Sequence, residues 1–349
     1  MRIAGVGHAF PPHYYNQQQL LAAAEEQWAS RLFNRERLGR LFDNVLVGGR
    51  HLALPLADYG QLESFGQTND AWIRVALATG AEALERAVAA AGLQLSEIDA
   101  LFTVSVTGIA TPALDARLMN RLDLPPQLKR TPIFGLGCVA GAAGIARAAD
   151  YVRAYPDQVA VLLSVELCSL TLQREDLSIA NLISTGLFGD GAAAVVIVGA
   201  ERTADGPRVL ASRSVFYPDT ERVMGWDISE RGFQIVLSAE VPAMVESHLR
   251  ADVDSFLGAH GLTRADIGSW VAHTGGPRVL TAMEEALEIP SSALALTWQS
   301  LREVGNLSST SVLLVLEETL SQARPEPGTP GLLLAMGPGF CSELVLLEW

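Results

Sequence analysis

Apolar residues recur along the chain with two different spacings, which predict strands and helices in regular succession. Short and almost wholly apolar runs predict strands at residues 1–10, 100–106, 158–165, 192–198, 269–272, 331–336 and 342–348, with further candidates at 208–217 and 232–238. Segments with apolar positions three or four residues apart predict helices at 17–35, 71–91, 112–122, 140–151, 180–187, 241–260 and 310–320, and another that ends near 287. Strands alternating with helices indicate an α/β protein in which sheets and helices pack as layers.

The order of these predicted elements repeats. In each half a capping turn leads to a strand, a glycine turn and a helix, and two strands around a glycine turn close the unit. Thr107 and His273 are 166 residues apart, and Cys138 and Asn306 are 168 residues apart. Because the two offsets agree, we predict two pseudo-duplicated halves, 1–200 and 201–349, fused into one compact body.

Cys138 stands where a predicted strand gives way to an Ala-rich predicted helix. Gly135, Gly137 and Gly141 surround it and allow a sharp turn and a close backbone approach. Unpaired N–H groups and the positive end of the helix dipole favour a thiolate at a helix N-terminus, so Cys138 is a candidate nucleophile. The alternative is an inert buried cysteine, since free cysteine is among the most buried residue types.

Pseudo-twofold symmetry predicts that Cys138 and Asn306 occupy equivalent helix N-termini near the centre, with His273 at the end of a neighbouring strand. This trio suits acyl transfer: the thiol accepts an acyl group, and the imidazole and the amide stabilise a thioester oxyanion. Taken singly, His273 could be a core histidine and Asn306 a helix cap. The repeat is what joins them into one predicted site.

Composition narrows the choice of partners and cofactors. The 349 residues carry a formal net charge of −14, which argues against nucleic acid or an anionic membrane as the main partner. Cys138, Cys168 and Cys341 make no disulfide framework and, with six scattered histidines, no metal-binding pattern. No apolar run approaches the roughly 18 residues that span a bilayer. We therefore expect a cytoplasmic protein with no membrane partner, no metal and no cofactor.

Five short motifs, in this order and spacing, resemble those of the type III polyketide synthases, the chalcone-synthase-like branch of the thiolase-fold condensing enzymes. They are Gly137-Cys138-Val139-Ala140-Gly141, Leu187-Phe188-Gly189-Asp190-Gly191, His273-Thr274-Gly275-Gly276-Pro277, Gly305-Asn306-Leu307-Ser308-Ser309 and Gly337-Pro338-Gly339-Phe340. The resemblance implies a layered αβαβα fold and a homodimer that uses free acyl-CoA and malonyl-CoA. It also implies that Cys138 is the acyl nucleophile and that His273 and Asn306 handle malonyl decarboxylation.

The same resemblance implies roles for further residues. Phe188 and Phe233 correspond to gate aromatics between a coenzyme A tunnel and the cavity. Predicted cavity-wall and cyclisation-loop positions are Val106, Cys168, Thr171, Gly225, Ser308, Gly337, Pro338 and Gly339. Arg37, Arg40 and Arg50 fall where the family binds coenzyme A phosphates.

Two departures from the plant enzymes change the expected product. Val106 replaces a polar residue and Cys168 replaces a threonine, which gives an apolar wall of small residues. Such a wall favours a bacterial enzyme that takes an aliphatic starter and makes an alkylpyrone or alkylresorcinol. The alternatives are a 3-oxoacyl-ACP synthase III-like enzyme that condenses once, a cysteine hydrolase and a non-catalytic acyl-binding protein.

Overall fold

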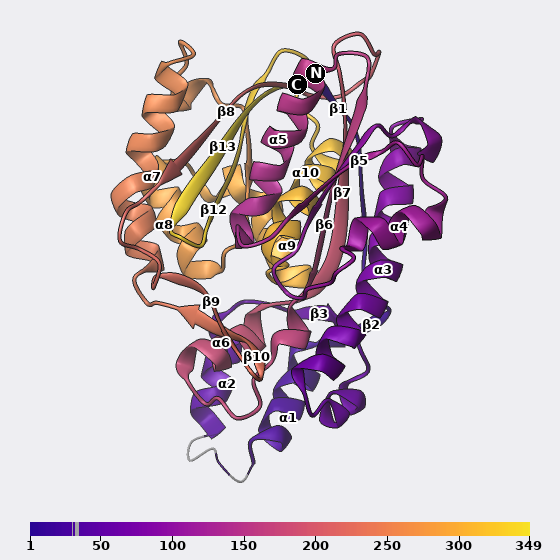
Figure 1. Ribbon diagram of the computed structural model, residues 1–349. Coiled ribbons are helices and arrows are strands. Elements are labelled where there is room, and N and C mark those ends of the chain that lie inside the picture. Colours follow the sequence, from indigo (N-terminus) through magenta and orange to yellow (C-terminus); the bar gives the residue numbers. More distant parts are fainter. Residues whose placement is uncertain (30, 32–34) are drawn as a thin grey trace.

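The computed structural model describes residues 1–29, 31 and 35–349, and in this part of the chain a nine-stranded mixed sheet runs through the molecule (Figure 1). The strand order is β11-β12-β13-β8-β1-β7-β6-β4-β5. The strands are β1 (Arg2–Ala9), β4 (Ala100–Val104), β5 (Lys129–Ile133), β6 (Val159–Leu167), β7 (Asp190–Val198), β8 (Arg208–Phe216), β11 (Ser269–Ala272), β12 (Pro330–Gly337) and β13 (Cys341–Glu348).

The topology repeats within this sheet. In the first half β4 and β6 are parallel, β6 and β7 are antiparallel, and β7 and β1 are antiparallel. In the second half β11 and β12, β12 and β13, and β13 and β8 show the same three relationships. The halves meet where Arg2 pairs with Arg208. The 3₁₀ turns Leu95–Glu97 and Arg264–Asp266 are both closed by capping boxes and start 169 residues apart, close to the predicted offset.

Helices cover both faces of each half. The helices that form the layers are α3 (Phe65–Ala90), α4 (Leu114–Leu122), α5 (Ala140–Ala154), α7 (Val241–Gly258), α8 (Pro277–Leu287) and α10 (Ser311–Gln322). Figure 1 shows α5 and α10 in the middle of the molecule, α3 and α4 on one side, and α7 and α8 on the other. This arrangement gives the layer order αβαβα and confirms the predicted thiolase-like fold class.

Alternating strand residues explain the layers. In β6, Ala160 and Leu162 pack in the central cluster with α5 and α10, whereas Val161 and Leu163 pack in the outer cluster with α3. The strand is buried at every position. Strands of this kind need helices on both faces, which is why the sequence runs show no polar alternation.

Smaller elements gather at one end of the sheet (Figure 1). They are β2 (His13–Asn16), β3 (Gly49–Leu52), β9 (Met224–Ser229), β10 (Gly232–Leu237), α1 (Gln17–Gln27), α2 (Arg35–Asn44) and α6 (Ile179–Leu187). The helix α9 (Ala295–Val304) precedes the second-half motif that contains Asn306. Residues of β9, β10 and α6 line the reaction cavity described below, and residues of β2, β3 and α1 line the chamber beside it. The sequence pattern had missed β2, β3, β9, α2 and α9.

One predicted helix, residues 17–35, is wrong at its C-terminal end. Helix α1 starts after the predicted cap Asn16 but ends at Gln27, and the rest of the predicted span partly lies outside the described residues. Trp28 explains the end. Its side chain is only 1% exposed and its Nε1 donates to the Arg174 carbonyl oxygen at 2.8 Å, which fixes the chain against a distant segment.

In the part of the chain that the structure describes, none of the helices has the length and apolar character needed to cross a bilayer.

Candidate active site

The candidate nucleophile lies in a tight turn that joins β5 to α5. Cys138 is the middle residue of the 3₁₀ turn Gly137–Val139, and its side chain is buried. Gly137 has a positive φ of 57°, and a Cβ placed there would meet Pro338 Cδ at 2.5 Å. Glycine is therefore required at residue 137 for conformation and for space.

His273 and Asn306 come from the second half. His273 follows β11 directly, and its backbone N–H donates to the Leu334 carbonyl oxygen at 3.1 Å. The Asn306 backbone joins the first half: its N–H donates to the Leu187 carbonyl oxygen, and its carbonyl oxygen accepts from Gly189 N–H. The side-chain Oδ1 of Asn306 accepts from the Ser308 N–H at 2.7 Å, which fixes the plane of the carboxamide.

The three predicted catalytic residues line one cavity, which we call the reaction cavity. It encloses about 50 Å³. Residues in its wall include Val106, Gly137, Cys138, Cys168, Phe188, Gly225, Trp226, Ile235, His273, Asn306, Ser308, Met336, Pro338 and Phe340. Cys138 Sγ lies 3.6 Å from Ser308 Oγ, so a hydroxyl from the second half contacts the thiol from the first. The structure thus brings the trio together as the repeat predicted.

Burial favours the neutral form of both titratable groups of the trio. It raises the pKa of Cys138 to about 12, although the hydrogen bond with Ser308 acts in the opposite direction. It lowers the pKa of His273 to about 4. Desolvation therefore opposes the stabilisation of a thiolate that we expect from the helix N-terminus. A thiolate here requires a proton acceptor.

A buried carboxyl group adjoins the trio, and the sequence analysis had missed it. Glu166 is fully buried in β6, and its Oε2 accepts from Val106 N–H at 3.1 Å and from Thr107 Oγ1 at 3.0 Å. Its Oε1 accepts from the Ser309 hydroxyl. Burial raises the pKa of Glu166 to about 7. The available signal was a single acidic residue in a strand whose other residues, except Ser164, are apolar.

A second chamber of about 870 Å³ adjoins the reaction cavity. Cys168, Phe188, Trp226 and Ile235 line both spaces and form the wall between them. The predicted wall residue Thr171 faces this second chamber. Its other lining is largely apolar and includes Leu20, Ala23, Trp28, Leu52 and Leu56.

Among the described residues that line the reaction cavity or the second chamber, three of the predicted gate and wall residues are missing: Phe233, Gly337 and Gly339. Phe233 packs edge-on against Phe65, with ring centroids 5.5 Å apart, whereas Ile235, two residues further along β10, is among the residues that line the cavity. The gate role expected of Phe233 stays a prediction. Gly337 and Gly339 flank the wall residue Pro338 and shape its turn.

The three predicted phosphate-binding arginines separate into two groups. Arg37 and Arg40 are exposed on α2, and Arg40 lies 3.7 Å from Glu36. Arg50 is only 2% exposed, and its Nη2 donates to the Thr185 carbonyl oxygen. Burial lowers the pKa of Arg50 to about 10. Arg50 is therefore buried and lines the second chamber, and its expected contact with coenzyme A phosphates stays a prediction.

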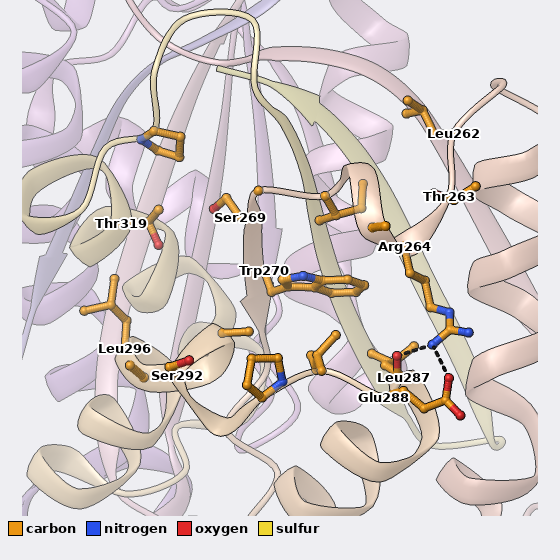
Figure 2. Close-up of a pocket in the computed structure, with 18 of the residues that line it drawn as sticks. Leu262, Thr263, Arg264, Ser269, Trp270, Leu287, Glu288, Ser292, Leu296 and Thr319 are labelled. Atoms are coloured by element: carbon orange, nitrogen blue, oxygen red, sulfur yellow. Dashed lines mark hydrogen bonds and ion pairs between the residues drawn. The ribbon is translucent and has the colours of Figure 1, made fainter.

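A larger hollow of about 1090 Å³ lies against β11, away from the trio (Figure 2). Figure 2 shows the Trp270 indole across its middle and Arg264 directed towards Leu287 and Glu288. Cys138, His273 and Asn306 are not among the described residues that line it. Within residues 1–29, 31 and 35–349, no group of three His, Cys, Asp or Glu side chains is placed to hold a metal ion.

Comparison with known proteins agrees with this geometry. Residues 2–202 match the N-terminal domain of the chalcone and stilbene synthases, and residues 208–348 match the C-terminal domain. The chain is 52% identical to a 1,3,6,8-tetrahydroxynaphthalene synthase of Streptomyces peucetius subsp. caesius, over 99% of this chain and 93% of that protein. It is 33% identical to a phloroglucinol synthase of Pseudomonas fluorescens, over 89% of this chain and 88% of that protein.

A solved structure extends the agreement to the fold. The crystal structure of 1,3,6,8-tetrahydroxynaphthalene synthase from Streptomyces coelicolor A3(2), described as a bacterial type III polyketide synthase, superposes with a TM-score of 0.95 at 32% identity. The match covers 100% of this chain and 99% of that one. The chain therefore belongs to the chalcone and stilbene synthase family of type III polyketide synthases.

Proposed function

We propose that Cys138 carries the growing chain in this polyketide synthase. The Cys138 sulfur attacks the carbonyl carbon of an acyl-CoA, a Cys138 thioester forms, and the bond to coenzyme A breaks. His273 takes the thiol proton and returns it to the departing coenzyme A sulfur, so the step is balanced. The observation that carries this proposal is the convergence of thiol, imidazole and carboxamide in one cavity.

Extension then uses malonyl-CoA. Its carboxylate leaves as carbon dioxide, and the electron pair becomes an enolate whose oxygen lies between the His273 ring and the Asn306 amide. Donors fixed in advance around such an oxygen supply much of the rate enhancement in comparable sites. The enolate carbon attacks the acyl group on Cys138, the thiolate leaves, and a 3-oxoacyl-CoA is released for reloading or cyclisation.

The experiment that tests this scheme combines labelling and product analysis. Purified protein receives an acyl-CoA, and intact-mass spectrometry follows the adduct; malonyl-CoA is then added and products are identified. We expect an acyl adduct that Cys138→Ala abolishes, followed by cyclised polyketides. A 3-oxoacyl product of one condensation would favour the 3-oxoacyl-ACP synthase III-like alternative, and free acid without malonyl incorporation would favour a hydrolase.

For the product we propose a polyhydroxylated aromatic built from malonyl units. The support is the 52% identity with a protein named as a tetrahydroxynaphthalene synthase. A second candidate is the alkylpyrone or alkylresorcinol expected from the apolar wall, and the large second chamber with its apolar lining favours it. Malonyl-CoA alone should give aromatic product in the first case, whereas the second requires an added alkanoyl-CoA.

We also propose how the substrates and a second subunit bind. Arg37 and Arg40 contact the coenzyme A phosphates, since both lie exposed on α2. Replacing both with alanine should raise the KM for malonyl-CoA and leave its decarboxylation chemistry intact. The chain forms a homodimer through β5, an exposed edge strand followed by the half-exposed Phe134. The enzyme works in the cytoplasm and uses no cofactor beyond its coenzyme A thioesters.

A further inference from the structure

We infer that Thr220 is a positioning residue that holds the wall of the reaction cavity and thereby controls how the polyketide cyclises. This inference rests on the proposed condensation and cyclisation. Thr220 lies outside the five motifs and outside the cavity wall, in the segment between β8 and β9. Its influence runs through the turn Gly337–Phe340, which joins β12 to β13.

That turn rests directly on the nucleophile. A Cβ on Gly337 would lie 2.7 Å from the Val139 nitrogen and 3.0 Å from the Leu136 carbonyl oxygen. On the other side of the contact, a Cβ on Gly137 would meet the Pro338 ring. The two turns are thus packed at backbone distance with no room for a side chain between them. A shift of Pro338 therefore changes the space beside Cys138 Sγ.

Thr220 and Tyr217 hold this turn through hydrogen bonds to Phe340. The Thr220 hydroxyl accepts from the Phe340 N–H and donates to the Tyr217 carbonyl oxygen at 2.6 Å. The Tyr217 N–H donates to the Phe340 carbonyl oxygen at 3.0 Å. Both backbone groups of Phe340 are therefore fixed by one short segment, and the Thr220 hydroxyl is satisfied as donor and as acceptor.

The segment is itself anchored to α7 and to the other cavity wall. The Tyr217 hydroxyl donates to Asp252, and the Tyr217 ring stacks on His248 with centroids 4.4 Å apart. On the opposite side, the Val223 N–H donates to the Thr220 carbonyl oxygen at 3.0 Å. Val223 directly precedes β9, whose residues Gly225 and Trp226 line the reaction cavity. Thr220 therefore links the turn Gly337–Phe340 to the part of the cavity wall that β9 forms.

Thr220→Val keeps the shape of the side chain and removes both hydroxyl bonds, whereas Thr220→Ser keeps them. With malonyl-CoA as substrate, we expect Thr220→Val to change the ratio of incompletely cyclised to fully cyclised products about fivefold, the effect of losing the one hydrogen bond that reaches the turn, from the Phe340 N–H. Acylation of Cys138 by an acyl-CoA alone should stay within about twofold, since Thr220→Val removes no hydrogen bond of the turn Gly137–Val139 that carries the thiol. Thr220→Ser should match the wild type in both measurements.

Two further variants separate positioning from general destabilisation. Thr263→Val removes a hydroxyl bonded to Asp266 in a surface capping turn, so it tests loss of stability alone. Tyr217→Phe removes the anchor to Asp252 and should shift the product ratio in the same direction, which keeps the test available should Thr220→Val fold poorly. An unchanged ratio in Thr220→Val and Tyr217→Phe, or an equal shift in Thr263→Val, overturns the inference. Absence of condensation products from the wild type would instead contradict the proposed function.

Discussion

Cys138 Sγ and Ser308 Oγ lie 3.6 Å apart, although the two residues belong to different halves of the chain. This hydrogen bond lowers the pKa of the Cys138 thiol, whereas burial raises it more strongly, and the net result is a pKa of about 12. Ser308 has a φ of 50°, a left-handed conformation that is uncommon outside glycine. The strain is tolerated because the same residue supplies the N–H that fixes the Asn306 carboxamide.

Removing the Ser308 hydroxyl should therefore slow the chemistry of the thiol. Ser308→Ala removes the partner that lowers the pKa of Cys138, so we expect alkylation of Cys138 by iodoacetamide to slow about three- to tenfold at neutral pH. The pH profile of the alkylation rate should move to higher pH. Peptide mass spectrometry distinguishes Cys138 from Cys168 and Cys341.

Ser300→Ala is the matched control for that substitution. Ser300 is buried and its Oγ has no hydrogen-bond partner among the described residues, so its loss should leave the profile where it is. Equal rates in Ser308→Ala and wild type would show that the hydroxyl does not assist the thiol.

The Asn306 amide has two roles that mutation can separate. Its Oδ1 holds the loop through the Ser308 N–H, and we propose that its Nδ2 stabilises the malonyl enolate. Asn306→Ala loses both, whereas Asn306→Asp keeps the acceptor and loses the donors. We expect both variants to accept an acyl group on Cys138 but to release carbon dioxide from malonyl-CoA about 100- to 1000-fold more slowly. Recovery of decarboxylation in Asn306→Asp would assign the residue to loop structure alone.

Local patterns predicted the scaffold of this site because each half repeats them. The predicted strand 269–272 coincides with β11, and the repeat offset placed His273 and Asn306 beside Cys138 without any knowledge of contacts. Both results depend on apolar runs and glycine turns, and each of these patterns spans only a few consecutive residues of the sequence.

The cavity wall could not be predicted in the same way. Phe233 and Ile235 lie on the same face of β10, and Ile235, which the hairpin register pairs with Trp226, is the one that lines the cavity. Arg50 resembles a surface cation in the sequence, but its position in β3 and the Thr185 carbonyl oxygen of α6 place it in the interior. These outcomes depend on packing between distant segments.

Glu166 should make the stability of the protein depend on pH. Burial raises its pKa from 4.5 to about 7 in the folded protein, so the folded state holds a proton that the unfolded state has released. The stabilisation is present below about pH 4.5 and is lost as the pH rises through about 7. Between pH 5 and 8 this group alone should lower the free energy of unfolding by about 2 to 3 kcal/mol.

Glu166→Gln tests this effect because the amide stays neutral and keeps one acceptor oxygen. Urea unfolding at pH 5 and pH 8 should show a smaller loss of stability in Glu166→Gln than in the wild type. Asp190 is also buried with a pKa raised to about 6, so part of the dependence should persist in the variant. Identical pH dependence in the two proteins would exclude Glu166 as a source.

Glycine at residue 137 should be essential for a reason that residue 135 does not share. Both have positive φ, 57° and 95°, so an alanine at either is strained. A Cβ at residue 135 meets no atom within 4 Å, whereas at residue 137 it would overlap the Pro338 ring at 2.5 Å. Gly137→Ala should therefore lower the free energy of unfolding by about 1 to 3 kcal/mol more than Gly135→Ala.

Gly137→Ala should also slow acylation of Cys138, because relief of the overlap moves the turn that carries the thiol. Chemical denaturation and the rate of adduct formation measure the two effects, and similar values for the two variants would mean that Pro338 yields without disturbing the nucleophile.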